Sequence, residues 1–567
     1  MPNNTLFFLK NRKDKLPIIR DNKCVKKNNT KGGKEMFDNF LIRKNSLKND
    51  YDKDGNIIGF QFAARNANYR GVFLSLHNGY YIKVDGIEYP RDVQTFEVNG
   101  KEPRTFEEIK TCVWEHWDYD DEGIIHIAKP GGLEPGVHTI EFQQSVLAAY
   151  GYLPTDEEWV KNPPVPGTGA GSDKTKNIVS YDLELQDRKP QGKIKRGVSL
   201  YSYQQTQFFK ELDLEGQIRE VGENLFGADG IELLDEMAIR QYPNPPQEFF
   251  DNWFAWMKKY DTKPVTMDVF HDVLQFRDHV MSYSESAERL KNDIRLAKKL
   301  GFKNVRTLAT TPFEILIEAL PVAEELDIRL AKEIHAPIPI NGQYVNEIVD
   351  YCEKTGTKHL GLVPDWGIFA FRPSEVTLDW YVRQGAKRET CDLVVQLCMD
   401  NYEGRSNELN DIDLSLYSAG NVESLFHRYI KHGEAPADLI PAFDKMEKLV
   451  RDNVPDYTEI DFEVMGQALL LSRTKPEDLG RILPYIVSIH GKFYNMSEIP
   501  GKPGQYQDIA IDYEGPINYL KEHGWEGYIN SEYEGQRRFQ DRGVEDLISE
   551  IDQVRKHQEM LKRLIGE

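Results

Sequence analysis

The feature that most constrains the fold is a regular alternation of strand-like and helix-like segments that begins after Lys193. Short β-branched, apolar runs alternate with longer amphipathic runs, which is the pattern of a parallel sheet joined by crossover helices. We expect eight such strands, ending near Tyr201, Glu232, Asp268, Arg306, Glu333, Asp365, His490 and Glu532. Eight parallel strands of this kind close into a (β/α)8 barrel. The sequence therefore predicts an α/β fold, with a TIM barrel catalytic domain over residues 193–567.

One connection in this barrel is much longer than the others. About 32 residues separate Glu333 from Asp365, which is a normal βα repeat, whereas the interval from Asp365 to His490 is several times longer. Segments within that interval have helical patterns. We therefore expect a helical insertion over about residues 371–480, on the active-site side of the barrel, where it can serve as a lid.

The part of the chain before the barrel has the pattern of antiparallel β structure. Runs such as residues 79–84 and 137–142 alternate in polarity, and turn signals such as Asp85-Gly86 and Asn99-Gly100 separate them. A strand-like run at residues 178–185 follows a Pro/Gly-rich loop, so the boundary falls after it. The sequence predicts an antiparallel β-sandwich domain over residues 36–188.

Length and composition limit the class of protein. A chain of 567 residues is too long for one core, and a formal net charge of -21 repels nucleic acid and anionic membranes. The five cysteines form no CxxC pair, and no apolar run is long enough to span a membrane, so we expect a cytoplasmic protein. Residues 1–35 are basic and polar and predict a disordered leader. A small-molecule partner fits these properties, and homo-oligomerisation is left open.

Four predicted strands end in residue types that bind metals. These residues are Glu333, Asp365, His490 and Glu532. The carboxyl ends of barrel strands meet at one face, so three carboxylates and one imidazole can converge there. Such a hard, oxygen-rich set suits Mn²⁺ best, with Mg²⁺ as the alternative, and suits zinc less well. The competing interpretation is that these side chains cap loops or make separate structural contacts.

Two further residues follow proposed ligands at a spacing of two. His335 and Lys492 stand two residues after Glu333 and His490, so on a strand they point to the same side as the ligand. His335 is a candidate general base for a carbon-bound proton. Lys492 is a candidate contact for a sugar hydroxyl or an oxyanion. A histidine that only makes hydrogen bonds, and a solvated loop lysine, are the alternatives.

Three other residues near strand ends are candidates for substrate binding. Arg306 and Glu232 can bind hydroxyl groups, although a polar network inside the barrel explains them equally well. Trp366 directly follows a proposed ligand and can stack on a sugar or an aromatic aglycone. Packing in the barrel rim is the alternative for this tryptophan.

At these residues the chain resembles the sugar phosphate isomerase/epimerase superfamily of metal-dependent barrels. The phrases Lys332-Glu333-Ile334-His335-Ala336-Pro337 and Val363-Pro364-Asp365-Trp366-Gly367, together with the large insertion, look most like the α subunit of bacterial C-glycoside deglycosylases.

The first domain resembles the small β subunit of the same enzymes, which is a β-sandwich protein. The matching phrases are Met36-Phe37-Asp38-Asn39, Tyr69-Arg70-Gly71-Val72, Val84-Asp85-Gly86, Tyr89-Pro90-Arg91 and Lys129-Pro130-Gly131-Gly132-Leu133. The resemblance implies a fusion of two partners that are usually separate chains.

The resemblance also implies a reaction. The family acts on glycosides already oxidised to the 3-oxo sugar, removes the proton at C2 and expels the aglycone from C1, which is a lyase reaction. By this resemblance Glu333, Asp365, His490 and Glu532 match the metal ligands, and His335 matches the base.

Two other functions remain open. A keto-sugar isomerase or epimerase uses the same kind of metal site with a second acid or base on the other face of the sugar. A noncatalytic carbohydrate-binding or scaffold protein would need no metal. The sequence does not distinguish carbon-linked from oxygen-linked aglycones.

Overall fold

A computed structural model describes residues 38–147, 156–163, 165–167, 178–186, 192–406 and 421–567. The leader predicted at residues 1–35 lies outside them. Contacts divide the chain into two compact units, residues 1–187 and 188–567. No helix in the part that the structure describes combines the length and apolar character of a membrane span.

The first unit is built from antiparallel sheets, as the sequence predicts. One sheet has the order β1 (Lys48–Tyr51), β2 (Ile57–Arg65), β9 (Glu122–Ala128), β6 (Gln94–Glu97), β7 (Arg104–Thr105). The other has the order β11 (Val179–Glu184), β10 (Val137–Val146), β4 (His77–Val84), β5 (Ile87–Glu88). A two-stranded pair joins β3 (Val72–Phe73) to β8 (His116–Trp117), and α1 (Phe106–Ile109) and α2 (Asp156–Lys161) are short helices.

The alternation of polarity along these strands places one face in a core. In β9 every second residue is buried, among them Ile125 and Ile127, and both pack in one apolar cluster with Phe60 and Phe142. The turn between β4 and β5 has positive φ at Asp85 and Gly86, which is the geometry of a tight two-residue hairpin.

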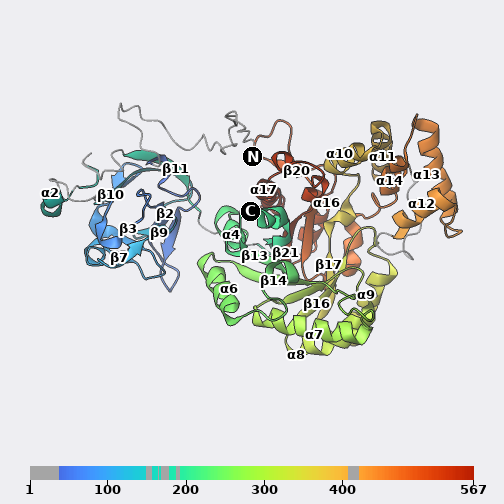
Figure 1. Cartoon of the computed structure of the whole chain (residues 1–567), viewed down its shortest axis with the longest axis horizontal. Coiled ribbons are helices and arrows are strands. Elements are labelled where there is room, and N and C mark those ends of the chain that lie inside the picture. Colours follow the sequence, from blue (N-terminus) through green and yellow to red (C-terminus); the bar gives the residue numbers. More distant parts are fainter. Residues whose placement is uncertain (1–37, 148–155, 164, 168–177, 187–191, 407–420) are drawn as a thin grey trace, which may run out of the picture. The chain divides into compact units, whose positions relative to one another are not determined.

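The second unit is an eight-stranded parallel barrel surrounded by helices (Figure 1). The strand order is β17 (Leu360–Pro364), β16 (Arg329–Ile334), β15 (Asn304–Thr307), β14 (Lys263–Val269), β13 (Gly230–Leu234), β12 (Ile194–Ser199), β21 (Gly527–Tyr533), β18 (Ile489–Phe493). Parallel bridges from Leu362 to Ile486 and from Asp365 to His490 connect the two ends of this order. The fold class is therefore the predicted TIM barrel preceded by an antiparallel β domain.

Helices cover the outside of the barrel. They are α3 (Gln204–Phe208), α4 (Leu214–Arg219), α5 (Asp235–Ala238), α6 (Gln247–Lys259), α7 (Tyr283–Lys299), α8 (Phe313–Glu325), α9 (Gln343–Thr355), α16 (Glu514–Glu522) and α17 (Glu550–Ile565). Helix α7 shows how the sequence sets their bounds. Ser282 and Glu285 form a capping box at its start, and Leu290, Ile294 and Ala297 form its buried face.

The long connection between β17 and β18 is helical. It contains α10 (Glu375–Gln384), α11 (Arg388–Tyr402), α12 (Asn421–His432), α13 (Ile440–Asn453), α14 (Glu459–Gln467) and α15 (Leu479–Ile482). Phe426, Phe443 and Met465 pack with residues of α10 and α11 in an apolar cluster separate from the barrel core. This insertion therefore has a small core of its own. The hairpin of β19 (Met496–Glu498) and β20 (Tyr506–Asp508) follows β18.

Candidate active site

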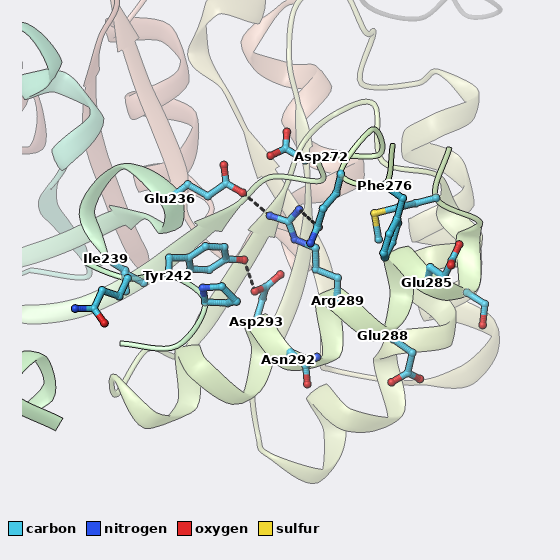
Figure 2. A pocket seen from close by; sticks show the side chains of 15 residues that line it. Glu236, Ile239, Tyr242, Asp272, Phe276, Glu285, Glu288, Arg289, Asn292 and Asp293 are labelled. Carbon is cyan, nitrogen blue, oxygen red and sulfur yellow. Dashed lines mark hydrogen bonds and ion pairs between the residues drawn. The ribbon is translucent and has the colours of Figure 1, made fainter. Parts of the chain in front are cut away.

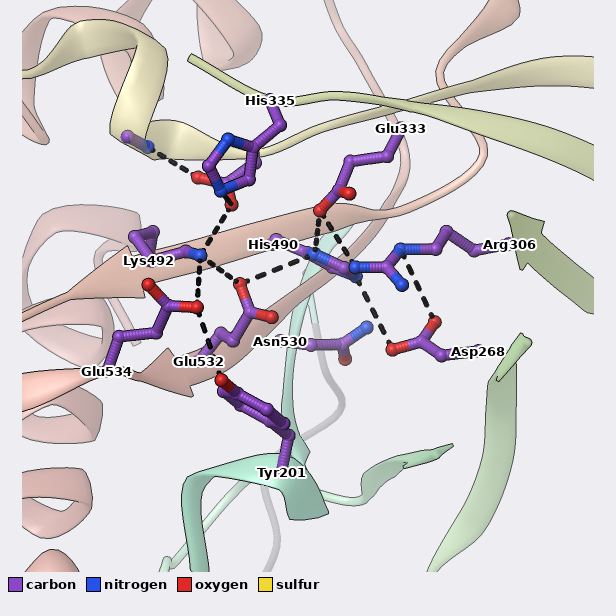
Figure 3. A network of polar contacts seen from close by, with 12 residues as sticks. Tyr201, Asp268, Arg306, Glu333, His335, His490, Lys492, Asn530, Glu532 and Glu534 are labelled. Atoms are coloured by element: carbon purple, nitrogen blue, oxygen red, sulfur yellow. Dashed lines mark hydrogen bonds and ion pairs between the residues drawn. The ribbon is translucent and has the colours of Figure 1, made fainter. Parts of the chain in front are cut away.

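The four predicted metal ligands lie together in the barrel, and Figure 3 shows three of them, Glu333, His490 and Glu532. Glu333 and Glu532 are the next-to-last residues of β16 and β21, His490 is in β18, and Asp365 directly follows β17. All four are buried. Because alternate strand residues point into the barrel, these positions project their side chains toward its interior.

His490 is at the centre of the group. Its Nδ1 atom lies 3.1 Å from Glu333 Oε1 and 3.4 Å from Glu532 Oε2. Glu333, Asp365 and His490 each place one ligand atom within 4.8 Å of the other two, so this trio can share one metal ion. Glu532 adjoins the trio through its contact with His490.

The opposite nitrogen of the same imidazole faces a second pair of carboxylates. His490 Nε2 lies 3.2 Å from Glu232 Oε1 and 3.8 Å from Asp268 Oδ2. Burial alone would lower the pKa of His490, but the neighbouring carboxylates of Glu232 and Glu532 raise it well above the ordinary value. Glu232, Asp268 and His490 also have the spacing of a metal site.

Two buried cations neutralise part of this negative charge. Arg306 Nη2 donates to Glu333 Oε1 at 2.8 Å, and Arg306 Nε lies 3.9 Å from Asp268 Oδ1. Burial alone would raise the pKa of Glu333, but Arg306 and His490 hold it below its ordinary value.

Lys492 is the second cation. Its Nζ lies 2.8 Å from Asp365 Oδ2, 3.2 Å from Glu532 Oε2 and 3.0 Å from Glu534 Oε1. We expected this lysine to contact a sugar hydroxyl or an oxyanion, and in the structure it is buried and its ammonium group contacts carboxylates. It therefore links two of the predicted ligands.

The charges of the described residues suit an additional cation. Six buried or nearly buried carboxyl groups surround the two permanent cations: Glu232, Asp268, Glu333, Asp365, Glu532 and Glu534. Burial raises the pKa of Asp365, and burial together with Glu232 raises that of Asp268 well above the ordinary value. Neither Asp268 oxygen has a hydrogen-bond partner in the described part of the chain. An oxygen-rich group with excess negative charge fits a hard divalent ion.

His335 differs from the ligands in being accessible. Its side chain is 40% exposed, and its Nε2 atom lies 3.8 Å from Asp365 Oδ2. Its Nδ1 atom is 2.8 Å from the carbonyl oxygen of Ala336, which can only accept a hydrogen bond. Nδ1 therefore carries the proton in the neutral ring, and the lone pair of Nε2 is free to accept one.

Trp366 is not accessible to a bound sugar or aglycone, as a stacking residue would have to be. Its side chain is fully buried, with its ring 4.9 Å from that of Tyr513 and 6.2 Å from that of Phe369. The 3-10 helix Trp366–Phe369 turns the chain away directly after Asp365, whose side chain accepts from the Gly367 amide. The expectation of ligand stacking is therefore corrected to packing in the core.

Glu232 is likewise enclosed. It is fully buried and accepts a hydrogen bond of 2.8 Å from Asn530 Nδ2 on β21. The structure thus places this residue behind His490, as a support for the imidazole, where we expected a substrate contact. Arg306 already contacts a predicted metal ligand, because its Nη2 atom donates to Glu333. Its Nη1 atom has no hydrogen-bond partner among the described residues.

Sequence reasoning missed Glu534. It follows β21 and reaches both Lys492 and Tyr201, whose hydroxyl lies 3.3 Å from Glu534 Oε1. The available signal was its spacing of two from Glu532, the same spacing that identified His335.

Comparisons with known proteins agree with the two units. A family model described as C-glycoside deglycosidase beta subunit matches residues 37–150. A C-glycoside deglycosidase beta subunit of Eubacterium cellulosolvens is 31% identical over 110 residues, which are 19% of this chain and 74% of that protein.

The barrel matches a different subunit. The 3'-dehydrocarminate deglycosidase alpha subunit of a Microbacterium species is 26% identical over 339 residues, 60% of this chain and 88% of that protein. A sugar phosphate isomerase/epimerase of Parabacteroides distasonis covers 71% of this chain and 99% of its own, with 10% identity and a TM-score of 0.35. The resemblance found in the sequence is confirmed: this chain belongs to the C-glycoside deglycosidase family, with a β-subunit-like domain followed by an α-subunit-like barrel.

Proposed function

We propose that the protein is a metal-dependent lyase that releases the aglycone from 3-oxo-glycosides by removing the C2 proton and eliminating the group at C1. The observation that carries this proposal is the grouping of Glu333, Asp365 and His490 in the barrel mouth, beside an accessible imidazole. Relatives named C-glycoside deglycosidase subunits support a carbon-linked glycoside as the substrate class.

Glu333, Asp365, His490 and Glu532 would hold the metal ion. Their donor set favours Mn²⁺, with Mg²⁺ as the alternative. A bound divalent ion would supply Lewis acidity, which stabilises negative charge on the sugar's oxo group when the neighbouring C–H bond ionises. Arg306 lowers the pKa of Glu333 and Lys492 lowers that of Glu532, and Lys492 also holds Asp365 in place through an ion pair.

His335 is the proposed base. Its Nε2 atom accepts the proton from C2, because Nδ1 is occupied by the Ala336 carbonyl. The electron pair of the C2–H bond becomes the second bond between C1 and C2. The bond from C1 to the aglycone breaks, and its electron pair leaves with the aglycone, which takes a proton. Phenolic aglycones suit this step because they stabilise the departing charge.

The two units of one chain correspond to subunits that are separate in the relatives. We propose that the fusion keeps both partners at equal stoichiometry, and that the fused chain works in the cytoplasm, in agreement with its cysteine pattern. Further homo-oligomerisation is left to measurement.

The test is aglycone release by protein loaded with Mn²⁺. A 3-oxo C-glycoside should yield free aglycone, and the same glycoside with an intact hydroxyl at C3 should not, because its C2 proton is not acidified. Release from both compounds would indicate ordinary hydrolysis. An intact sugar with an inverted or isomerised carbon would favour the keto-sugar epimerase.

A further inference from the structure

A cavity lies outside the metal group. Its volume is about 940 Å³, and it is formed by the segment that follows β13, the loop between β14 and α7, and one face of α7 (Figure 2). Its lining includes none of the residues assigned above to the metal site or to the proton transfer. A function for this cavity is therefore independent of the proposed lyase reaction.

Most charged groups around the cavity already have partners. Arg289 Nη2 donates to Glu236 Oε1 at 2.5 Å, and Arg289 Nη1 donates to Gln275 Oε1 at 3.3 Å. Glu288 is paired with Lys291 at 2.7 Å, and Glu285 caps α7 through Ser282. An anionic ligand would thus meet carboxylates and an arginine that is already engaged.

Asp293 is the exception. It is 1% exposed, and its Oδ1 atom accepts a hydrogen bond of 2.5 Å from the hydroxyl of Tyr242. Its Oδ2 atom has no hydrogen-bond partner in the part of the chain that the structure describes. Burial raises the pKa of Asp293 to about 6, although Tyr242 lowers it. A buried carboxylate oxygen without a donor is costly, so a ligand that donates a hydrogen bond there is favoured.

Part of the remaining wall is apolar and aromatic, and polar side chains complete it, namely Gln241, Asp272, Ser284 and Asn292. The apolar and aromatic part is formed by Ile239, Tyr242, Pro243, Phe276 and Met281. The Phe276 side chain is 42% exposed, and its ring is stacked on that of His279 with centroids 4.8 Å apart. The faces of these rings match a flat aromatic ring better than a hydrated sugar.

We propose that this cavity binds a neutral phenol, whose hydroxyl group donates to Asp293 Oδ2 while its ring packs on the wall formed by Tyr242 and Phe276. A phenolic hydroxyl is a stronger hydrogen-bond donor than an aliphatic one, because it is more acidic. The site thus adds a second place for aromatic compounds on the barrel, separate from the metal group.

The test uses phloroglucinol, a neutral triphenol, in titration calorimetry with the full chain carrying His335→Ala, so that no turnover occurs. Asp293→Asn should weaken binding at least tenfold, and Phe276→Ala, at an exposed ring that folding does not require, about fivefold. The control is Glu248→Gln on the exposed side of α6, which should leave binding unchanged. The compound 1,3,5-trimethoxybenzene, which lacks the donor, should bind at least tenfold more weakly.

Three results would overturn the proposal. The first is the absence of phloroglucinol binding. The second is an affinity that neither Asp293→Asn nor Phe276→Ala lowers, and the third is tighter binding of butylammonium than of phloroglucinol. Loss of aglycone release in a metal-site variant would leave these titrations unaffected, so failure of the lyase and failure of this site can be told apart.

Discussion

The Nε2 atom of His490 lies 3.2 Å from Glu232 Oε1, on the side of the imidazole away from its contact with Glu333. A carboxylate in this position fixes the orientation of a ligand imidazole and increases its basicity. Glu232→Gln should therefore lower the affinity for Mn²⁺ by about 10-fold while the fold is kept. Titration calorimetry measures this affinity, with the exposed Asp251→Asn on α6 as control. Unchanged affinity would remove Glu232 from the supporting role.

Glu333 and His335, two residues apart on one segment, should respond differently to substitution. Glu333→Gln removes a ligand, so metal content and aglycone release should fall together. His335→Ala removes the base, so the metal should remain while turnover falls by about 10² to 10⁴. Metal analysis and release assays on the same preparations separate the two effects. Full turnover in the His335→Ala variant would exclude His335 as the base.

Lys492 should stabilise the protein most when no metal is bound. Lys492→Met leaves Asp365, Glu532 and Glu534 without their shared cation, which should cost about 3–5 kcal/mol of unfolding free energy in the absence of metal. Mn²⁺ should then raise the melting temperature more in the variant than in the wild type, because the ion replaces the lost charge.

Lys332→Met is the matched control. Lys332 is also buried on a barrel strand, but its Nζ atom has no hydrogen-bond partner among the described residues and lies 4.8 Å from the ring of Tyr344. Its replacement should change stability little, and the response to Mn²⁺ should stay that of the wild type. Equal behaviour of the two variants would argue against the charge compensation assigned to Lys492.

The first unit should lose stability as the solution becomes basic. Burial alone would lower the pKa of His126, but contacts of 2.8 Å with Asp50 and 3.0 Å with Glu97 raise it to about 9. Because the folded-state pKa is raised, the stabilisation is complete below about pH 6.5 and is lost as pH rises to 9, by on the order of 3 kcal/mol at most.

His126→Gln should remove this loss. Its melting temperature should change less between pH 6 and pH 9 than that of the wild type. His116→Gln, at the exposed pair with Asp118, serves as the control and should keep the wild-type dependence. A wild-type protein whose first unit is equally stable at both pH values would contradict the assignment.

The sequence predicted the site best where a metal-binding residue type stands near the end of a strand. Glu333 and Glu532 are the next-to-last residues of β16 and β21, and barrel closure brings such ends together whatever the loops do. The strand expected to end near His490 instead begins at Ile489 and continues to Phe493. The Asp85-Gly86 turn was predictable for a similar reason, because few residues adopt two successive positive φ angles.

The remaining features depend on contacts between distant segments. The direction of Trp366 is set by a 3-10 turn capped by Asp365, and the partners of Lys492 come from the ends of β17 and β21. The position of Glu232 behind His490 requires the register of β13 with the strands beside it. Periodicity reports which side of a strand a residue occupies, but it does not report which side chains from other strands share that space.

The most direct test of C2 deprotonation is a kinetic isotope effect on aglycone release. A 3-oxo C-glycoside with deuterium at C2 is compared with the protium compound, using Mn²⁺-loaded protein in single turnovers, and His335→Ala is assayed in parallel. The mechanism predicts slower release from the deuterated compound, together with loss of the deuterium from the sugar product. Equal rates with deuterium retained at C2 in the released sugar would contradict it.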